Sequence, residues 1–228
     1  ANPVVLDDDK KPVIDNGSAK LRFGDEEIRL SRDPFPLFPG EMLVGKVTPL
    51  QVVAPNAALR LRCIRDFTDD KGKKRVAGDE WLFVGPATYL PAVEVQVVEV
   101  VRATVIKEGQ ALKLRARRAL VDSLGKERTA GEQWLVRAVG AYLPNVDEEI
   151  VETVSSITIT DKKALHLRAR QTYTDSFEVV RKAGQEWLIT IAQAESYIPD
   201  VYEDVVGEVK ITTLNSRQFC VILDPVDE

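Results

Sequence analysis

Short stretches of strict alternation between apolar and polar side chains run through this sequence. Between residues 59 and 63, the apolar Leu59, Leu61 and Cys63 alternate with Arg60 and Arg62. Successive side chains of a β-strand point to opposite faces, so this two-residue period predicts strands with one buried face and one wet face. The alternation returns in residues 112–117, and no stretch shows a sustained 3.6-residue apolar period with caps. The pattern therefore predicts an all-β protein.

The alternating stretch is one landmark of an internal repeat. The motif Ala-Leu-x-Leu-Arg, with Lys or His at x in the later copies, begins at residues 58, 111 and 164, a spacing of 53 residues. Each copy is followed by an Ala-Gly pair, a Trp-Leu pair and a Tyr-Leu-Pro or Tyr-Ile-Pro exit, and a small insertion at residues 193–196 displaces the last exit by two residues. A fainter copy without tryptophan precedes them in residues 19–53. Landmarks that recur at one period indicate tandem structural units.

The repeat predicts five segments. Residues 1–51 are expected to form a diverged or partial repeat, residues 52–104, 105–157 and 158–213 three full repeats, and residues 214–228 the start of a next repeat. A unit of this size buries only about 60% of its surface and is marginally stable alone. We therefore expect small antiparallel β-sheet repeats that stack lengthwise and share stability with their neighbours.

The fixed positions of the repeat indicate a core within each unit. A polar turn at residues 122–125 predicts a hairpin, and a second strand then carries the Trp-Leu pair. The predicted structural core consists of the repeated tryptophans, leucines and glycines: Trp81, Trp134, Trp187, Leu61, Leu114, Leu167, Gly78, Gly131 and Gly184.

Trp134 is the clearest of the three tryptophans, because its repeat has strong units on both sides. Alternation places Trp134 and Val136 on one face, where we expect them to pack on Leu112, Leu114 and valines of the strand that follows residue 144. The alternative is that the tryptophans line a ligand groove, as in sugar-binding β-modules.

Composition narrows the classes of function. The chain has 31 Lys and Arg against 36 Asp and Glu, a net charge of −5, with the two signs interspersed. No large basic face is expected, which argues against direct contact with nucleic acid. No apolar run approaches the roughly 18 residues of a spanning helix, so no membrane contact is expected. Cys63 and Cys220 lie in different repeat positions and indicate neither a disulfide nor a metal pair, which fits a reducing, intracellular location.

Residues that could carry catalysis are few. His166 is the only histidine, and its repeat equivalents, Arg60 and Lys113, mark a solvated position on the polar strand face. Without a second histidine or a nucleophile in a recognisable setting, acid–base or triad chemistry lacks its components. Cys63 falls on the inward face and is expected to be a small core residue. The sequence therefore predicts no enzyme, no catalytic residue and no cofactor.

Two charged loops have alternative interpretations. Residues 66–72 faintly resemble a calcium loop, but with Gly72 at the sixth position the fifth is Lys71 and the first is Phe67. We expect a hairpin tip there and no metal site. The basic runs at residues 71–75 and 115–118 could touch RNA, yet acids lie beside the first and no stacking aromatics are interleaved, which favours solvated loops.

The motifs taken together resemble a known family. The Ala-Leu-x-Leu-Arg, Ala-Gly-x-x-Trp-Leu and Tyr-Leu-Pro series, with stretches at residues 23–30, 33–37, 48–53, 77–83 and 220–226, resembles the repeats of the major vault protein family over nearly the whole chain. The resemblance implies a structural protein, part of the wall of a large hollow cytoplasmic ribonucleoprotein shell. It implies as partners copies of the chain itself, side by side, and vault poly(ADP-ribose) polymerase and other vault proteins docked on the wall. The alternative is a monomeric β-repeat array that binds a peptide or another ligand.

Overall fold

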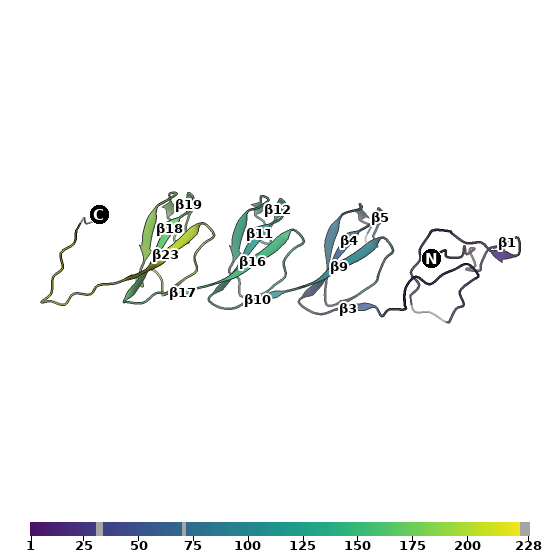
Figure 1. Cartoon of the computed structure of the whole chain (residues 1–228), viewed down its shortest axis with the longest axis horizontal. Helices are drawn as coiled ribbons and strands as arrows, with labels where there is room; N and C mark the ends of the chain where they lie inside the picture. The colour runs from purple at the N-terminus through teal and green to yellow at the C-terminus, as the bar shows by residue number, and fades with distance from the viewer. Residues whose placement is uncertain (31–33, 70–71, 224–228) are drawn as a thin grey trace. The chain divides into compact units, whose positions relative to one another are not determined.

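The computed structural model describes residues 1–30, 34–69 and 72–223. Within these ranges the chain forms 23 short strands and no helix, and every strand pair between them is antiparallel (Figure 1). The sheets hold only two or three strands each. The predicted class, an all-β chain of small antiparallel sheets in tandem repeats, is confirmed.

One order of seven strands occurs three times along the chain. The first set is β3 (Gln51–Val53), β4 (Ala57–Cys63), β5 (Phe67–Thr68), β6 (Lys74–Arg75), β7 (Glu80–Val84), β8 (Ala87–Tyr89) and β9 (Val95–Arg102). The second is β10 (Thr104–Ile106), β11 (Gln110–Ala116), β12 (Leu120–Val121), β13 (Glu127–Arg128), β14 (Gln133–Val136), β15 (Gly140–Tyr142) and β16 (Glu148–Ser155). The third is β17 (Ile157–Thr158), β18 (Lys163–Ala169), β19 (Tyr173–Thr174), β20 (Val180–Arg181), β21 (Glu186–Ile189), β22 (Ser196–Tyr197) and β23 (Glu203–Lys210).

Each set folds into the same three sheets. In the first, β4 lies between β7 and β9, β5 pairs with β6 in a small hairpin, and β3 pairs with β8. The second and third sets repeat this pairing strand for strand. A register shift interrupts the pairing of β4 with β9 between Arg60 and Leu61, and it returns at Lys113 and Leu114 and at His166 and Leu167. The three units therefore share a β-bulge as well as a topology.

Each unit has its own core. In the first, Leu59 and Leu61 of β4 pack with Val53 of β3 and Tyr89 of β8, so the two-stranded sheet covers the apolar face of the three-stranded one. The central strand is the most buried element because both of its edges are paired, and Leu59, Leu112 and Leu165 occupy the same place in the three cores. Each 53-residue repeat of the sequence therefore corresponds to one separate hydrophobic core.

Consecutive strands of neighbouring units are joined by very short links. One residue, Ser156, separates β16 from β17, and its amide donates a hydrogen bond to the carbonyl of Gly109, 2.7 Å away. Ala103 and Ile211 hold the equivalent positions, with their amides on Asn56 and Lys162. Each link is therefore hydrogen-bonded to the turn that precedes the central strand of the unit before it.

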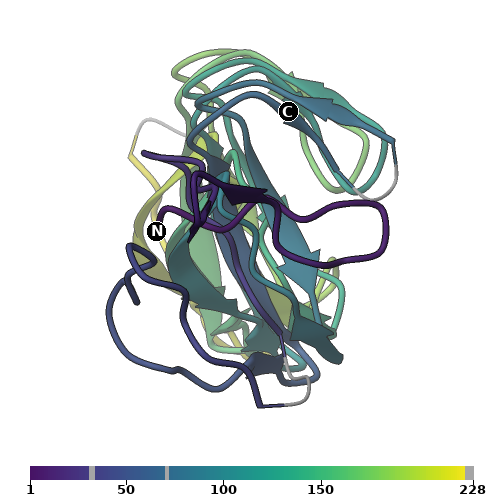
Figure 2. The ribbon, with the colours of Figure 1, turned by 90° about the vertical axis from the view of Figure 1, so that its right-hand side faces the viewer.

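The N-terminal segment is mostly irregular. A hairpin joins β1 (Ile14–Asp15) to β2 (Ser18–Ala19), and isolated bridges pair Val4 with Leu21 and Leu6 with Pro12. In the described part of residues 22–50 the backbone forms no strand. Figure 2 shows this segment in purple and dark blue as loops with little regular structure.

Candidate functional site

The predicted core residues lie where the three-stranded sheet meets its hairpin. Strand register places Leu61 opposite Trp81, Leu114 opposite Trp134 and Leu167 opposite Trp187. The three leucines and Trp134 are buried, whereas Trp81 and Trp187 are partly buried. Trp134 packs with Leu112, Leu114 and Val136, but the strand after Pro144 contributes Ile150 to this cluster in place of the expected valines.

The three repeated glycines form the turn that leads into the tryptophan strand. Gly78, Gly131 and Gly184 have φ values of 96°, 84° and 80°. Their amides donate to the carbonyls of Cys63, Ala116 and Ala169, each at 2.8 Å, and so close the end of the central strand. A Cβ at any of the three would meet no atom within 4 Å, so the left-handed backbone and not space favours glycine.

An arginine of the small hairpin covers the indole ring in every unit. The guanidinium carbons of Arg75, Arg128 and Arg181 lie 4.3, 4.9 and 4.5 Å from the ring centroids of Trp81, Trp134 and Trp187. This is the geometry of a cation–π contact.

The same arginines bind an aspartate at the start of the hairpin turn. Nε of Arg128 donates to Oδ2 of Asp122 at 2.8 Å, while Oδ1 of Asp122 accepts the amides of Leu124 and Lys126. Arg181 and Asp175 repeat this at 2.8 Å, and Arg75 and Asp69 at 3.2 Å. We call these sets the hairpin clamps: Asp69, Arg75 and Trp81; Asp122, Arg128 and Trp134; Asp175, Arg181 and Trp187.

Electrostatics favours the charged form of the clamp acids. Burial alone would raise the pKa of Asp122, but the amides of Lys126 and Leu124 and the guanidinium of Arg128 outweigh it and lower the pKa. The pKa of Asp175 is lowered in the same way by Arg181 and two backbone amides. Each hairpin is thus fixed to its sheet by an ion pair and an aromatic contact at once.

The hairpin clamps could have been predicted from the sequence, because their charged residues also repeat. Arg75, Arg128 and Arg181 recur at the 53-residue period, as do Asp69, Asp122 and Asp175. The prediction that Arg75 belongs to a solvated basic run is wrong, because its side chain is only 14% exposed and contacts Asp69 and Trp81. Asp70 and Lys71 of the candidate calcium loop lie outside the described residues. Across the part of the chain that the structure describes, no three His, Cys, Asp or Glu side chains are grouped to hold a metal ion.

A buried carboxylate accepts from the exit tyrosine in two of the three units. Tyr142 donates to Glu148 and Tyr197 to Glu203, both at 2.7 Å, and Tyr173 also donates to Glu203. In the first unit Val95 occupies the carboxylate position, and the buried Tyr89 hydroxyl has no such acceptor among the residues that the structure describes. Burial raises the pKa of Tyr89, opposed only by the backbone of Ala92.

The polar face of each sheet is neutralised within the chain. Arg60 contacts Glu80 and Glu99, and Lys113 contacts Glu152 at 3.0 Å. His166 occupies the equivalent position, with Nε2 2.9 Å from Glu186. Arg60 thus lies between acids of both outer strands, while Lys113 and His166 each contact an acid of one outer strand.

The second and third units meet through this polar face. Nη2 of Arg137 lies 3.2 Å from Asp200. A pocket between them is lined by Lys113, Leu135 and Glu152 of one unit and by residues 199–201 and 203–205 of the other. The contact joins a sheet to the loop after the Tyr-Ile-Pro exit of the next unit.

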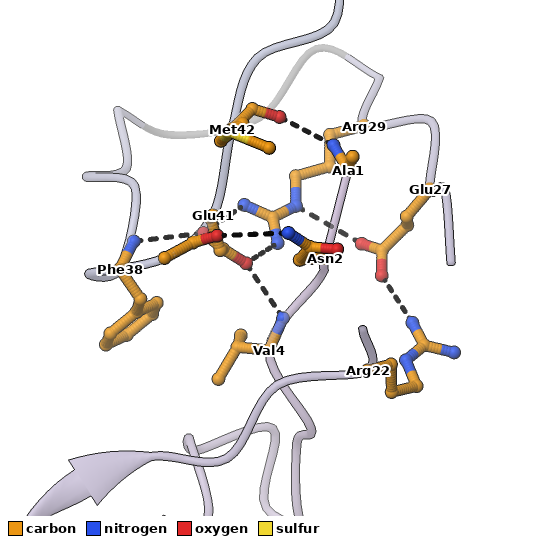
Figure 3. Close-up of polar contacts among 10 residues, drawn as sticks. Ala1, Asn2, Val4, Arg22, Glu27, Arg29, Phe38, Glu41 and Met42 are labelled. Carbon is orange, nitrogen blue, oxygen red and sulfur yellow. Dashed lines mark hydrogen bonds and ion pairs between the residues drawn. The ribbon is translucent and has the colours of Figure 1, made fainter. Parts of the chain in front are cut away.

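A carboxylate organises the irregular N-terminal segment. The side chain of Glu41 is 2% exposed and accepts from Nη2 of Arg29 at 2.6 Å, from the amide of Val4 at 2.8 Å and from the amide of Phe38 at 3.0 Å (Figure 3). Burial would raise the pKa of Glu41, but these donors outweigh it and lower the pKa to about 2. Arg29 also binds Glu27, which binds Arg22 in turn. Residues distant in sequence are thereby held around one charged pair.

The remaining candidates are placed as follows. Cys63 is buried in β4, where burial raises the pKa of its thiol, and Cys220 is exposed; the structure records both as free thiols. Arg118 is 81% exposed. None of the described residues belongs to a helix that could span a membrane.

Comparison with known proteins identifies the class of these repeats. The family model described as the major vault protein repeat domain matches residues 51–92, 104–145 and 157–200, and a second model of the same description matches residues 1–47. The chain belongs to the major vault protein repeat family.

Relatives resemble this chain over nearly its whole length. It is 59% identical over 228 residues to major vault protein alpha of Dictyostelium discoideum, which covers 99% of this chain and 27% of that protein. It is 56% identical to the major vault protein of Bos taurus over 227 residues, 99% of this chain and 26% of the relative, and 54% identical to that of Homo sapiens, 99% and 25%. The chain thus spans about a quarter of the length of the curated relatives it matches.

Proposed function

We propose that this chain is a structural wall segment of a vault-type ribonucleoprotein shell in the cytoplasm, with no catalytic activity. In this proposal residues 52–104, 105–157 and 158–213 are successive wall units stacked lengthwise, residues 1–51 are a diverged unit, and residues 214–228 begin another. Copies associate side by side, and the wall offers docking surface to vault poly(ADP-ribose) polymerase and other vault proteins.

The observation that carries the proposal is that the repeated tryptophans contact residues of their own unit. Every repeated tryptophan has an arginine over its ring, and that arginine is bound to an aspartate of its own hairpin. A ligand-binding array would leave ring faces open and polar groups convergent in a pocket. The repeated tryptophans, leucines and glycines serve in this proposal to build a stiff unit.

The rival is a monomeric array that binds a peptide. It is favoured by a groove along the N-terminal segment, where Ile28, Leu30, Phe35, Leu37, Met42 and Leu43 are each 40% or more exposed. A peptide receptor requires no association between copies, whereas a wall segment does.

A chimera separates the two. The matching segment of major vault protein alpha from Dictyostelium discoideum would be replaced by this chain, and the product purified by sedimentation and imaged by electron microscopy. Closed hollow particles are expected. A matched variant, Leu114→Asp, should fold poorly and give none, because a buried charge is costly at this fully buried position.

The contrary outcome is equally clear. If the chimera is folded by circular dichroism but remains a dispersed monomer, while the parent protein prepared alongside forms particles, the wall assignment is wrong. Co-sedimentation of purified vault poly(ADP-ribose) polymerase with the chimeric particles tests docking; loss of co-sedimentation relative to the parent would remove docking from the proposal.

A further inference from the structure

The hairpin of the N-terminal segment turns on the only Asn-Gly pair in the sequence. Asn16 and Gly17 lie between β1 and β2, whose register pairs Asp15 with Ser18, so the turn has two residues. Their φ values are 48° and 80°, the left-handed conformation that two-residue hairpin turns require. Both residues and Ile14, Asp15 and Ser18 around them are exposed.

The chemistry of this pair depends on what the side-chain amide and the next backbone nitrogen contact. Across the described residues, the Asn16 side chain makes no hydrogen bond and the Gly17 amide donates none. Gly17 is exposed and a Cβ built on it would meet nothing within 4 Å, so no neighbouring side chain crowds the pair. Only the conformation of the turn, and no hydrogen bond among the described residues, keeps the Asn16 side chain and the Gly17 nitrogen from reacting.

Each of the other four asparagines differs from Asn16 in the residue that follows it or in a hydrogen bond at the site. Asn2 precedes a proline, which has no N–H. Asn145 precedes the β-branched Val146, whose amide is bound to the Asn145 side chain at 2.8 Å. The amide that follows Asn56 donates to the carbonyl of Ala54, and the side-chain oxygen of Asn215 accepts the amide of Arg217 at 3.0 Å.

We propose that Asn16 is the site at which this chain undergoes spontaneous deamidation and isoaspartate formation. The backbone nitrogen of Gly17 attacks Cγ of Asn16, ammonia leaves, and a five-membered succinimide forms. Water then opens the ring at either carbonyl and gives aspartate or isoaspartate.

The hairpin affects the rate of deamidation and is itself changed by the product. The left-handed turn must open briefly before the nitrogen can reach Cγ, and two-residue strands at an exposed tip open at low cost in free energy. IsoAsp adds a backbone carbon and a negative charge to a turn that fits two residues only. The pairing of Ile14 with Ala19 is then lost, and the N-terminal hairpin is converted from an ordered to an open state in an age-dependent way.

The test is incubation of the native full chain at mildly alkaline pH, with peptide mass spectrometry and methyl transfer to isoaspartate by an isoaspartyl methyltransferase as readouts. The amide-to-acid mass change and methyl acceptance are expected at Asn16 first, with Asn56 and Asn145 unchanged as internal references. Asn16→Gln should lose both signals, because the larger ring closes far more slowly. Asn16→Asp should accept methyl groups without any change in mass.

Two results would overturn the proposal. One is a native chain in which Asn16 stays an amide while the urea-unfolded chain converts, since the turn then protects the residue. The other is conversion that begins at Asn215 or is spread evenly over the asparagines.

Discussion

The guanidinium of Arg128 lies over the indole of Trp134 and bridges it to Asp122, so one arginine joins the hairpin of a unit to the core of its main sheet. Arg75 with Trp81 and Arg181 with Trp187 repeat the relationship. The hairpins hold only two residues in each strand, and the arginine is one of their contacts with the main sheet.

The first prediction concerns this bridge. Arg128→Met keeps an unbranched apolar stem but removes the guanidinium and its charge, leaving the buried Asp122 without its cation. Loss of the cation–π contact and of a charged hydrogen bond should together cost about 2–4 kcal/mol of unfolding free energy. Denaturant titration measures it, with the exposed Arg118→Met as matched control. A change as small as that of the control would show that the hairpin is held by other contacts.

The second prediction concerns the tryptophans. Trp134→Ala should cost about 3–5 kcal/mol through lost burial and the cavity left behind, and neighbouring units should loosen as well. Trp134→Phe should recover part of the loss because it refills the apolar space. Thermal unfolding followed by circular dichroism tests both. A melting temperature within error of the parent for Trp134→Ala would reject the core role and revive a ligand-binding one.

The third prediction uses one substitution at three equivalent sites. Tyr142→Phe and Tyr197→Phe each remove a hydrogen bond to a buried carboxylate and should destabilise the chain by about 1–3 kcal/mol. Tyr89→Phe should be nearly neutral, since Val95 stands where the other units have glutamate. Chemical unfolding of the three variants side by side checks this, and an equal loss at Tyr89 would contradict the assignment of Glu148 and Glu203 as the acceptors that matter.

The fourth prediction concerns acid. The pKa of Glu41 is lowered from 4.5 to about 2, so its stabilising contribution is complete above 4.5 and is lost as pH falls towards 2. Glu41→Gln should therefore loosen the N-terminal segment strongly at neutral pH and much less near about pH 3. Hydrogen exchange at the amides of Val4 and Phe38 reports it. The exposed Glu26→Gln is the control, and a pH-independent difference would argue against the charged form of Glu41.

The strands could be predicted from the sequence because apolar and polar residues alternate within each long strand. Leu61 and Arg60 differ in polarity along one strand, so strand and face are local information, and repetition at residues 114 and 167 removes ambiguity. The clamps require a different kind of inference, since Arg75 looks like part of a basic loop until its contact with Trp81 is known. Glu41 and Val4 are 37 residues apart in a segment whose sequence shows no regular alternation. The sequence around either residue therefore does not predict their contact.

The single-residue links described above determine where this chain can tolerate a change of length. A strand reverses its faces with every residue added, so one extra residue at Ser156 would turn the face of β17 outward or break the bond to Gly109. The repeats show where an insertion is tolerated. The third repeat carries its two additional residues between Trp187 and Tyr197, in the loop before the exit, and none at a link. A fluorescent or affinity label should accordingly be accepted at residues 193–195 and rejected at Ser156.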